Sequence, residues 1–416
     1  MLGIQRQPSG LQLAKVEGHT GGVWSVALSA DGRLLASGGL DGTVRLWEAP
    51  TGQLLATLQG DTNGVWTVAL TTDGQLLAGN SWDGTVRLWE SPSGRPLATL
   101  EGHTGGVYSV ALSAERWLLA SGGQDGPVRL WEAHTGRLVA TLQGHTGSVW
   151  GVALSADGRL LASGGQDGTV RLWEAPGGRL VATLHGHTGT VFSVSLSADG
   201  RLLASGGMDG TVRLWSLADI RLGEQTMLGM QRQPSGQQLA TLEGHTNAVR
   251  GVALSADGLL LASGSFDGTV RLWEVPSGQQ LATLDGHTGG VWGVALSADG
   301  RLLASGGTSG TVKLWEAPGG RLVATLQGHT DTVWGVSLSA DGRLLASGGM
   351  DGTVRLWEAS NGAHLHTLRS DRRYERVDVT GMTGVTAAQR VSLLALGAIE
   401  RGQATEVSMG VPFSHS

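Results

Sequence analysis

Histidine, serine and aspartate recur together along this chain, and these three residue types form the catalytic triad of many hydrolases. In the first copy they are His19, Ser37 and Asp41. Catalysis would require a histidine between a serine nucleophile and an orienting carboxylate, with oxyanion donors nearby. Six stretches of the sequence carry the complete set, and six separate triads in one chain make no sense as active sites. We therefore interpret the set as structural and predict that the protein is not an enzyme.

The residues that position these groups form an internal repeat. A Gly-His-Thr sequence begins at Gly18 and recurs at Gly102, Gly144, Gly186, Gly244, Gly286 and Gly328, while the same slot at Gly60 carries Asp61. The spacing is 42 residues everywhere except between Gly186 and Gly244, where it is 58. The chain contains eight units of one kind.

Each unit has the pattern of four short strands. In the first unit, residues 23–28 alternate at period two, and residues 34–38, 44–47 and 53–58 supply three further strands. Asp31-Gly32, Asp41-Gly42 and Thr51-Gly52 mark the turns between them. One such sheet cannot bury both of its faces alone, so neighbouring sheets must stack and the array must close. The predicted fold is all-β, an eight-bladed β-propeller of four-stranded antiparallel blades.

Gly-His, about 28 residues and then Leu-Trp-Glu resembles the Gly-His…Trp-Asp signature of WD-repeat propellers, over residues 18 to about 370. The resemblance implies that His19, Ser37 and Asp41 join Trp47 in a hydrogen-bonded tetrad that braces the strands. It implies further tetrads at His103, Ser121, Asp125 and Trp131; His145, Ser163, Asp167 and Trp173; His187, Ser205, Asp209 and Trp215; His245, Ser263, Asp267 and Trp273; and His329, Ser347, Asp351 and Trp357. Unit two departs at Asp61 and Gly79, and unit seven at Ser309, so we expect these blades to be the weakest.

Comparison of the eight units shows three variable positions. The residue before the tetrad aspartate is Leu40, Trp82, Gln124, Gln166, Met208, Phe266, Thr308 and Met350. A position near the start of the first strand is Trp24, Trp66, Tyr108, Trp150, Phe192, Arg250, Trp292 and Trp334. Two residues earlier stand Gly22, Gly64, Gly106, Ser148, Thr190, Ala248, Gly290 and Thr332. By the same resemblance, all three positions lie on the top face, around the central channel.

An arginine in an otherwise aromatic slot is awkward to bury, which favours exposure of this set over packing between blades. Aromatic and arginine side chains are also the usual hot spots of interfaces. We predict a scaffold or sensor module that binds a protein or peptide there. The alternative is a small-ligand or glycan-binding propeller that uses the same aromatic set.

Composition narrows the partners. The net charge of −6 gives no bulk attraction to nucleic acid or anionic membranes, and no apolar run approaches the roughly 20 residues of a membrane-spanning helix. There is no cysteine, and neither lysine lies in a phosphate-binding motif, so we expect no cofactor and no metal. The predicted location is cytoplasmic.

The ends of the repeat region leave an alternative open. Residues 1–17 match residues 227–243 at 13 of 17 positions, and the inner copy belongs to an insertion at about 217–232 and the fourth strand after it. The N-terminal segment 1–17 is therefore a candidate strand that closes the ring by completing blade eight. A local strand at residues 363–368 is the rival, with a cheaper loop closure; of the two, we favour N-terminal closure.

Residues 371–416 form a tail with a predicted helix at about 386–400, capped by Thr386. Repeat and tail together resemble the WD-repeat regions of bacterial signalling and defence ATPases, which implies an ATPase-containing signalling protein as a partner.

Overall fold

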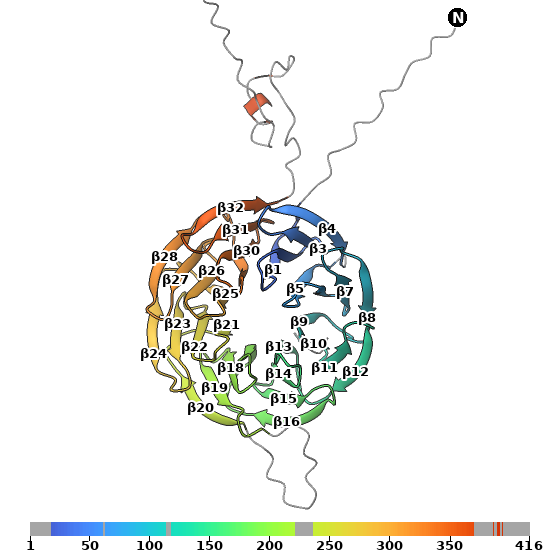
Figure 1. Cartoon of the computed structure of the whole chain (residues 1–416). Coiled ribbons are helices and arrows are strands. Elements are labelled where there is room, and N and C mark those ends of the chain that lie inside the picture. Colours follow the sequence, from blue (N-terminus) through green and yellow to red (C-terminus); the bar gives the residue numbers. More distant parts are fainter. Residues whose placement is uncertain are drawn as a thin grey trace, which may run out of the picture. The chain divides into compact units, whose positions relative to one another are not determined.

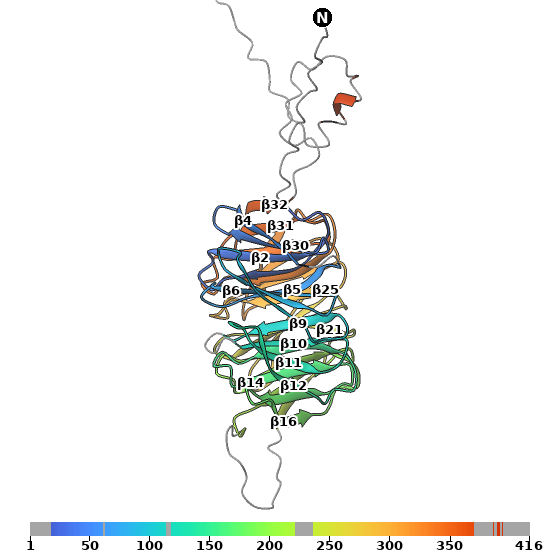
Figure 2. The same ribbon diagram turned by 90° about the vertical axis from the view of Figure 1, so that its right-hand side faces the viewer.

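A computed structural model describes residues 18–60, 63–113, 118–220, 236–369, 386, 389–391 and 393. The chain divides into two compact units, one of residues 18–369 and one of residues 1–17 with 370–416. The first unit forms eight four-stranded antiparallel sheets, each with its strands in chain order. The sheets are arranged as the blades of a ring (Figures 1 and 2). The predicted eight-bladed all-β propeller is confirmed.

Each blade contributes one strand to each of four concentric layers (Figure 1). The inner strands are β1 (Val23–Leu28), β5 (Val65–Leu70), β9 (Val107–Leu112), β13 (Val149–Leu154), β17 (Val191–Leu196), β21 (Val249–Leu254), β25 (Val291–Leu296) and β29 (Val333–Leu338). The second strands are β2 (Leu34–Gly39), β6 (Leu76–Ser81), β10 (Leu118–Gly123), β14 (Leu160–Gly165), β18 (Leu202–Gly207), β22 (Leu260–Ser265), β26 (Leu302–Gly307) and β30 (Leu344–Gly349). The third strands are β3 (Thr43–Glu48), β7 (Val86–Glu90), β11 (Val128–Glu132), β15 (Val170–Glu174), β19 (Val212–Ser216), β23 (Val270–Glu274), β27 (Val312–Glu316) and β31 (Val354–Glu358). The outer strands are β4 (Gln53–Gln59), β8 (Pro96–Leu100), β12 (Arg137–Leu142), β16 (Arg179–Leu184), β20 (Gln237–Leu242), β24 (Gln280–Leu284), β28 (Arg321–Leu326) and β32 (Ala363–Leu368).

The turns within a blade depend on glycine. Gly32, Gly42 and Gly52 have φ angles of 68°, 76° and 70°, in the left-handed region that residues with a side chain rarely adopt. They are the second residues of the Asp-Gly and Thr-Gly pairs that the sequence marked as turns. The repeated dipeptides therefore set the chain reversals that make four short strands out of each unit.

The hydrophobic core lies between the blades. Between blades one and two, Val44 and Leu46 of β3 pack with Val65 of β5, Leu77 of β6 and Trp89 of β7, and all five side chains are at most 3% exposed. Seven equivalent clusters join the other neighbouring pairs of blades. Each sheet thus buries both faces, and burial of a single large apolar side chain stabilises by about 1.5–3 kcal/mol.

The inner strands are also tied to each other around the channel. The Val68 N–H donates to Ser25 Oγ of the preceding blade at 3.2 Å, and the Leu28 N–H donates to Ser337 Oγ at 3.2 Å. The second bond crosses the seam between blades eight and one, where Val23 packs with Val354 and Leu368. The ring of residues 18–369 is therefore closed by the same contacts that join its other blades.

Blade eight is completed by its own outer strand, so the expectation that an N-terminal strand takes this position was wrong. β32 pairs antiparallel with β31, from Val354↔Leu368 to Glu358↔Ala363. A short turn joins these two strands, and local closure costs less chain entropy than bringing a distant segment to the same edge. The segment 1–17 lies outside the described residues.

The predicted insertion begins after β19, where Leu217 is still buried in the core, and β20 begins at Gln237. Residues 221–235 between them lie outside the described part of the chain. In the tail, Gln389–Val391 and Leu393 are helical, and the Gln389 N–H donates to Thr386 Oγ1 at 3.2 Å. The Thr386 N–H donates in return to Gln389 Oε1 at 2.8 Å, which completes a capping box. Thr386 is therefore the helix cap that the sequence predicted, and the rest of the predicted helix lies outside the described residues.

The closure of blade eight by β32 can be tested by mutation. We expect Leu368→Ala to lower the free energy of unfolding by about 2–4 kcal/mol, because Leu368 is 6% exposed in the core between blades eight and one. Leu365→Ala, on the same strand but 38% exposed, should cost far less. Deletion of residues 1–17 should leave urea unfolding nearly unchanged. If that deletion destabilises the ring as much as Leu368→Ala, an N-terminal strand contributes to closure after all.

Candidate binding face and the network that supports it

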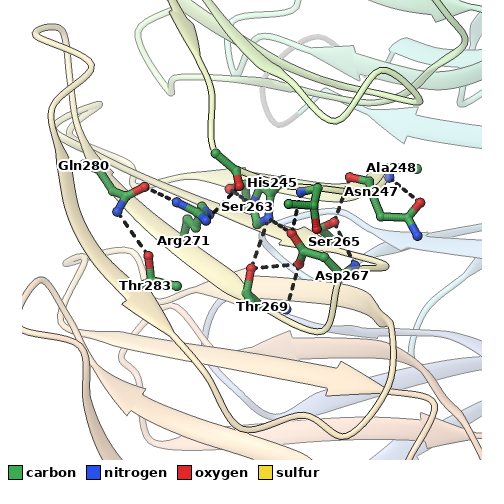
Figure 3. Close-up of polar contacts among 12 residues, drawn as sticks. His245, Asn247, Ala248, Ser263, Ser265, Asp267, Thr269, Arg271, Gln280 and Thr283 are labelled. Carbon is green, nitrogen blue, oxygen red and sulfur yellow. Dashed lines mark hydrogen bonds and ion pairs between the residues drawn. The ribbon is translucent and has the colours of Figure 1, made fainter.

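Blade six has a complete tetrad, and Figure 3 shows its histidine, serine and aspartate. His245 Nε2 lies 2.9 Å from Ser263 Oγ, and His245 Nδ1 lies 3.0 Å from Asp267 Oδ2. The indole N–H of Trp273 donates to Ser263 Oγ at 2.9 Å. The ionised Asp267 can only accept, so the neutral His245 ring donates its Nδ1–H to the carboxylate and its Nε2 accepts from the Ser263 hydroxyl. The serine oxygen in turn accepts from the indole N–H.

This arrangement of hydrogen bonds excludes a nucleophilic role for the tetrad serine. Ser263 is 0% exposed, and an indole N–H occupies the oxygen that would have to attack a substrate. The His–Ser distance is 2.7–2.9 Å in all six complete tetrads, and every tetrad serine is 0% exposed. The tetrads therefore brace the blades, as the sequence predicted.

The tetrad carboxylates are held ionised by their donors. Burial alone would raise the pKa of Asp267, but donation from the Thr269 and Thr246 N–H groups and the Thr269 hydroxyl lowers this pKa to about 2. Burial is likewise outweighed at Asp167, whose pKa falls to about 2 through the equivalent threonines. Asp267 accepts hydrogen bonds from two segments of the chain, His245–Thr246 and Thr269, and so fixes the turn after the second strand.

Blade three keeps its tetrad although Pro127 replaces the threonine that follows the aspartate by two residues. Proline has no N–H or hydroxyl to donate. Arg129 takes over these contacts, with Nη1 at 2.8 Å from Asp125 Oδ2 and 2.7 Å from His103 Nδ1. Sequence analysis did not single out Pro127, although it stands alone among the eight copies of that position.

Blade two has a substitute for its missing histidine and serine. The buried Asn80 accepts the Thr67 N–H at 2.6 Å and donates to the Val107 carbonyl of blade three at 2.8 Å. It thereby links two blades through a side chain. The expectation that blade two is among the weakest did not take this compensating contact into account.

Blade seven has no such substitute. His287 Nε2 lies 2.8 Å from Ser305 Oγ, but the nearest contact of Nδ1 is Thr311 Oγ1 at 3.4 Å. Burial, with the nearby charge of Lys313, lowers the pKa of His287 to about 4. We therefore still expect blade seven to be the weakest.

The variable positions meet at one end of the channel, which we call the upper face. It is the end where the inner strands begin and the second strands finish, as the pairing Val23↔Gly39 shows. We call the set on the inner strands the channel belt: Trp24, Trp66, Tyr108, Trp150, Phe192, Arg250, Trp292 and Trp334. We call the set before the tetrad aspartate the rim: Leu40, Trp82, Gln124, Gln166, Met208, Phe266, Thr308 and Met350.

The side chains of the channel belt contact each other from blade to blade. Ring centroids are 4.6 Å apart for Trp24 and Trp66, 5.9 Å for Trp66 and Tyr108, and 4.5 Å for Tyr108 and Trp150. The Trp150–Phe192 distance is 5.7 Å and the Trp292–Trp334 distance 4.0 Å. All eight belt side chains are half-buried. The belt side chains are thus partly exposed and also pack against one another, so the expectation of exposure in place of packing between blades holds only in part.

Arg250 fills the gap between Phe192 and Trp292. Its guanidinium carbon lies 4.3 Å from the Phe192 ring centroid and 4.8 Å from that of Trp292, with Phe266 at 5.4 Å and Trp150 at 5.9 Å. Burial lowers the pKa of Arg250 to about 10, which leaves it charged at neutral pH. Among the described residues, no carboxylate forms an ion pair with it. The aromatic faces are the stabilising environment of this cation.

The rim residues lie against the next blade. A methyl group on Gly22 would stand 2.6 Å from Met350 Sδ, and one on Gly106 would stand 3.2 Å from the Trp82 ring. Gly290 is related in the same way to Phe266, and a methyl group on Gly64 would meet the Trp24 ring at 3.0 Å and the Leu40 Cα at 3.3 Å. Where the rim residue is Gln124, the next blade carries Ser148, whose hydroxyl donates to the Gln124 carbonyl at 3.3 Å. The variation at the third position is therefore a packing response to the rim.

The rim also makes the upper face asymmetric. Met350, Leu40 and Trp82, on the consecutive blades eight, one and two, are 38%, 42% and 43% exposed. Gln124 and Gln166 give the next two blades an exposed polar rim. We call the first three residues the apolar arc. The opposite end of the channel holds a pocket of about 330 Å³ lined mainly by leucine, alanine and serine, including Leu28, Leu196 and Ala298.

The described part of the chain offers neither a metal site nor a membrane-spanning helix. No group of three or more histidine, aspartate and glutamate side chains there is arranged to hold a metal ion. None of the described helices has the length and apolarity to cross a membrane.

A closed ring of four-stranded blades, most of them braced by a His–Ser–Asp–Trp network, defines a β-propeller of repeated units. The WD40 family model, described as WD domain, G-beta repeat, matches residues 10–48, 52–90, 94–132, 136–174, 178–216, 236–274, 278–316 and 320–358. These matches cover more than half of the chain, which therefore belongs to the WD40 family. No curated protein matches it significantly. Among solved structures, it is similar to the computationally designed Ika8 protein, with 30% identity, a TM-score of 0.69, and coverage of 84% of this chain and 100% of that one.

The tetrad is testable in blade six. Ser263→Ala removes the hydrogen-bond partner of both Trp273 Nε1 and His245 Nε2, and we expect a loss of about 2–4 kcal/mol in the free energy of unfolding. Ser277→Ala removes an exposed hydroxyl that contacts Glu274 and should cost less than about 0.5 kcal/mol. Equal losses for the two variants in urea unfolding would contradict the bracing role.

Blade seven gives a pH-dependent prediction. The pKa of His287 lies below its ordinary value of 6.5, so the unfolded chain binds the proton more readily and stability falls as the pH drops from 6.5 toward 4. Ser309→Asp supplies a carboxylate that raises this pKa. From pH 7 to 4.5, wild type should lose about 1–2 kcal/mol more than the variant. Urea unfolding at both pH values measures the difference, and parallel losses would refute the assignment.

Proposed function

We propose that the upper face of this propeller binds a segment of a protein or peptide, with the channel belt and the apolar arc as the contact surface. The observation that carries the proposal is the convergence of seven aromatic side chains and one arginine, each from a different blade, at one mouth of the channel. WD40 propellers are commonly protein-interaction scaffolds, which agrees with this assignment.

The exposed part of the surface favours a protein ligand. The apolar arc offers leucine, methionine and tryptophan, and flexible thioether side chains adapt to apolar partners of different shape. Large apolar side chains that gather on a surface are typical of interaction sites. Four indole N–H groups of the belt are buried and have no acceptor among the described residues, so they are not accessible to a ligand. These are the groups of Trp66, Trp150, Trp292 and Trp334.

Arg250 adds a charge requirement. A cation without a carboxylate partner favours a ligand that brings an anionic group to this part of the belt. The partner we propose is thus a segment with apolar side chains and at least one acidic group.

A glycan or small ligand is the alternative, because indole faces stack on sugars and the exposed amides of Gln124 and Gln166 lie on the same face. It differs from the main proposal in the part of the rim that it would use, since the polar rim residues lie on blades three and four and the apolar arc on blades eight, one and two.

The setting is also a proposal. The likeness of repeat and tail to bacterial signalling and defence ATPases supports a cytoplasmic signalling role beside an ATPase-containing partner. The net charge of −6 supports partners other than nucleic acid and anionic membranes.

The proposal predicts which substitutions abolish binding. Peptides would be selected on the intact chain from a random displayed library, and their affinities measured for variants. We expect Trp82→Ala and Arg250→Met each to weaken the selected peptides by about tenfold or more, as hot-spot residues do. Arg301→Ala, in an exposed turn at the opposite face, is the matched control and should change nothing.

Two results would count against a peptide-binding upper face. One is a set of peptides that bind all three variants equally. The other is a chain that selects no peptide but binds sugars on a glycan array, with the loss of binding at Gln124→Ala instead of Trp82→Ala.

A further inference from the structure

Blade seven retains the donors that surround a carboxylate in the complete blades but lacks the carboxylate itself. In blade eight, Asp351 accepts hydrogen bonds from the Thr330 N–H at 2.9 Å and from the Thr353 N–H and hydroxyl at 3.0 and 2.7 Å, with His329 Nδ1 at 3.1 Å. The equivalent positions of blade seven are Thr288, Thr311 and His287, and the aspartate position is Ser309. All three donor residues of the network are thus kept where their acceptor is lost.

The vacated position is open to solvent. The Asp351 side chain is only 7% exposed, whereas Ser309 is an exposed residue. The hydroxyl of Ser309 contacts Thr311 Oγ1 at 2.7 Å and makes no contact with His287. A group from outside can therefore approach the place that a carboxylate occupies in the seven other blades.

A buried cation supplies the matching charge. Lys313 is 7% exposed, and its ammonium contacts Thr325 Oγ1 at 3.2 Å and lies 5.8 Å from the Trp315 ring centroid. Among the described residues no carboxylate pairs with it. It is close enough to His287 to depress the pKa of that ring. In blade three, Arg129 at the same position reaches Asp125 Oδ2 at 2.8 Å, so a cation here can contact a carboxylate.

The protonation pattern of His287 is also undecided without a carboxylate. In the complete blades, the aspartate accepts from Nδ1–H and so fixes one tautomer. In blade seven, Ser305 Oγ and Thr311 Oγ1 can each donate or accept, so both tautomers are compatible with the contacts. A carboxylate at Ser309 would select the Nδ1–H form.

We propose that blade seven binds one carboxylate group, which takes the place of the missing tetrad aspartate. The Thr288 N–H, the Thr311 hydroxyl and His287 Nδ1–H donate to it, and Lys313 provides the counter-charge. The site lies on the upper face beside the rim residue Thr308, yet it depends on none of the contacts of the channel belt. It goes beyond the proposed function and can hold when that function fails.

The test uses the intact chain with isotope-labelled histidine and sodium acetate as the probe, at pH 7 and constant ionic strength set with sodium chloride. His287→Gln identifies the His287 resonances. We expect acetate to shift them saturably, with a midpoint on the order of 10 mM, as suits a single charged group. The ring should move toward the Nδ1–H tautomer. Absence of a shift at His287, or an equal response to chloride, would overturn the proposal.

Ser309→Asp is the matched control, because it supplies the carboxylate within the chain. Its His287 spectrum should resemble that of acetate-saturated wild type, and its response to acetate should fall at least about tenfold. Retention of the full acetate response would place the binding elsewhere. Lys313→Met should weaken acetate binding while leaving the Ser305 contacts of His287 in place.

The carboxylate could belong to a small molecule or to an acidic side chain of a partner. Short capped peptides with a central glutamate, compared with their glutamine counterparts, separate these sources. A glutamate-specific shift of His287 identifies a side chain as a competent ligand, and a response to acetate alone identifies a small-molecule site. Neither result requires Trp82 or Arg250, so Trp82→Ala should leave both responses unchanged even where it abolishes peptide binding at the belt.

Discussion

Burial of both faces of every blade is the constraint on which this structure depends. A single four-stranded sheet would expose one or both apolar faces, and here Val44, Leu46 and Trp89 are covered only because another blade lies beside them. The ring must close for the same reason, since an open array would leave two uncovered ends. β32 and the packing of Val23 on blade eight meet that requirement. The tetrads, the channel and the upper face all take their positions from this stacking.

The tetrads show how a repeated network tolerates change. In each, the histidine links the start of the blade to the serine of the second strand, and that serine accepts from the tryptophan of the third strand, so the loss of one member affects all three. Blade three replaces a threonine by Arg129, and blade two replaces the histidine and serine by Asn80, which reaches the next blade. Blade seven replaces nothing, and His287 and Lys313 remain as a donor and a cation without a carboxylate. The same backbone thus carries braced, rebuilt and incomplete networks side by side.

The upper face owes its asymmetry to a few substitutions on a nearly symmetric frame. Each rim side chain leans over the next blade, so its size is matched by glycine at Gly22, Gly64, Gly106 or Gly290 or by a small residue elsewhere. Large apolar rim residues lie on blades eight, one and two and again, as Met208 and Phe266, on blades five and six, whereas the amides lie on blades three and four. Arg250 breaks the aromatic belt at one point and brings a charge into it. A symmetric scaffold can in this way present a directional surface.

The sequence by itself determined the number of blades, the four strands of each and the turns, because these depend on local periodicity and on residues repeated at fixed spacing. The tetrads followed from the resemblance of the repeat to WD-repeat propellers. The sequence also identified Thr386 as a helix cap and the variable positions around the channel. It could not decide which of two candidate strands completes blade eight, since both have the same local pattern and only pairing with β31 distinguishes them. Nor could it show that the belt aromatics stack on each other, that Asn80 and Arg129 repair their networks, or that rim and glycine vary together. The belt stacking, the Asn80 bond to blade three and the rim–glycine pairs are contacts between neighbouring blades, and the Arg129 contacts join two turns of one blade. They exist only once residues that are distant in the sequence are brought side by side.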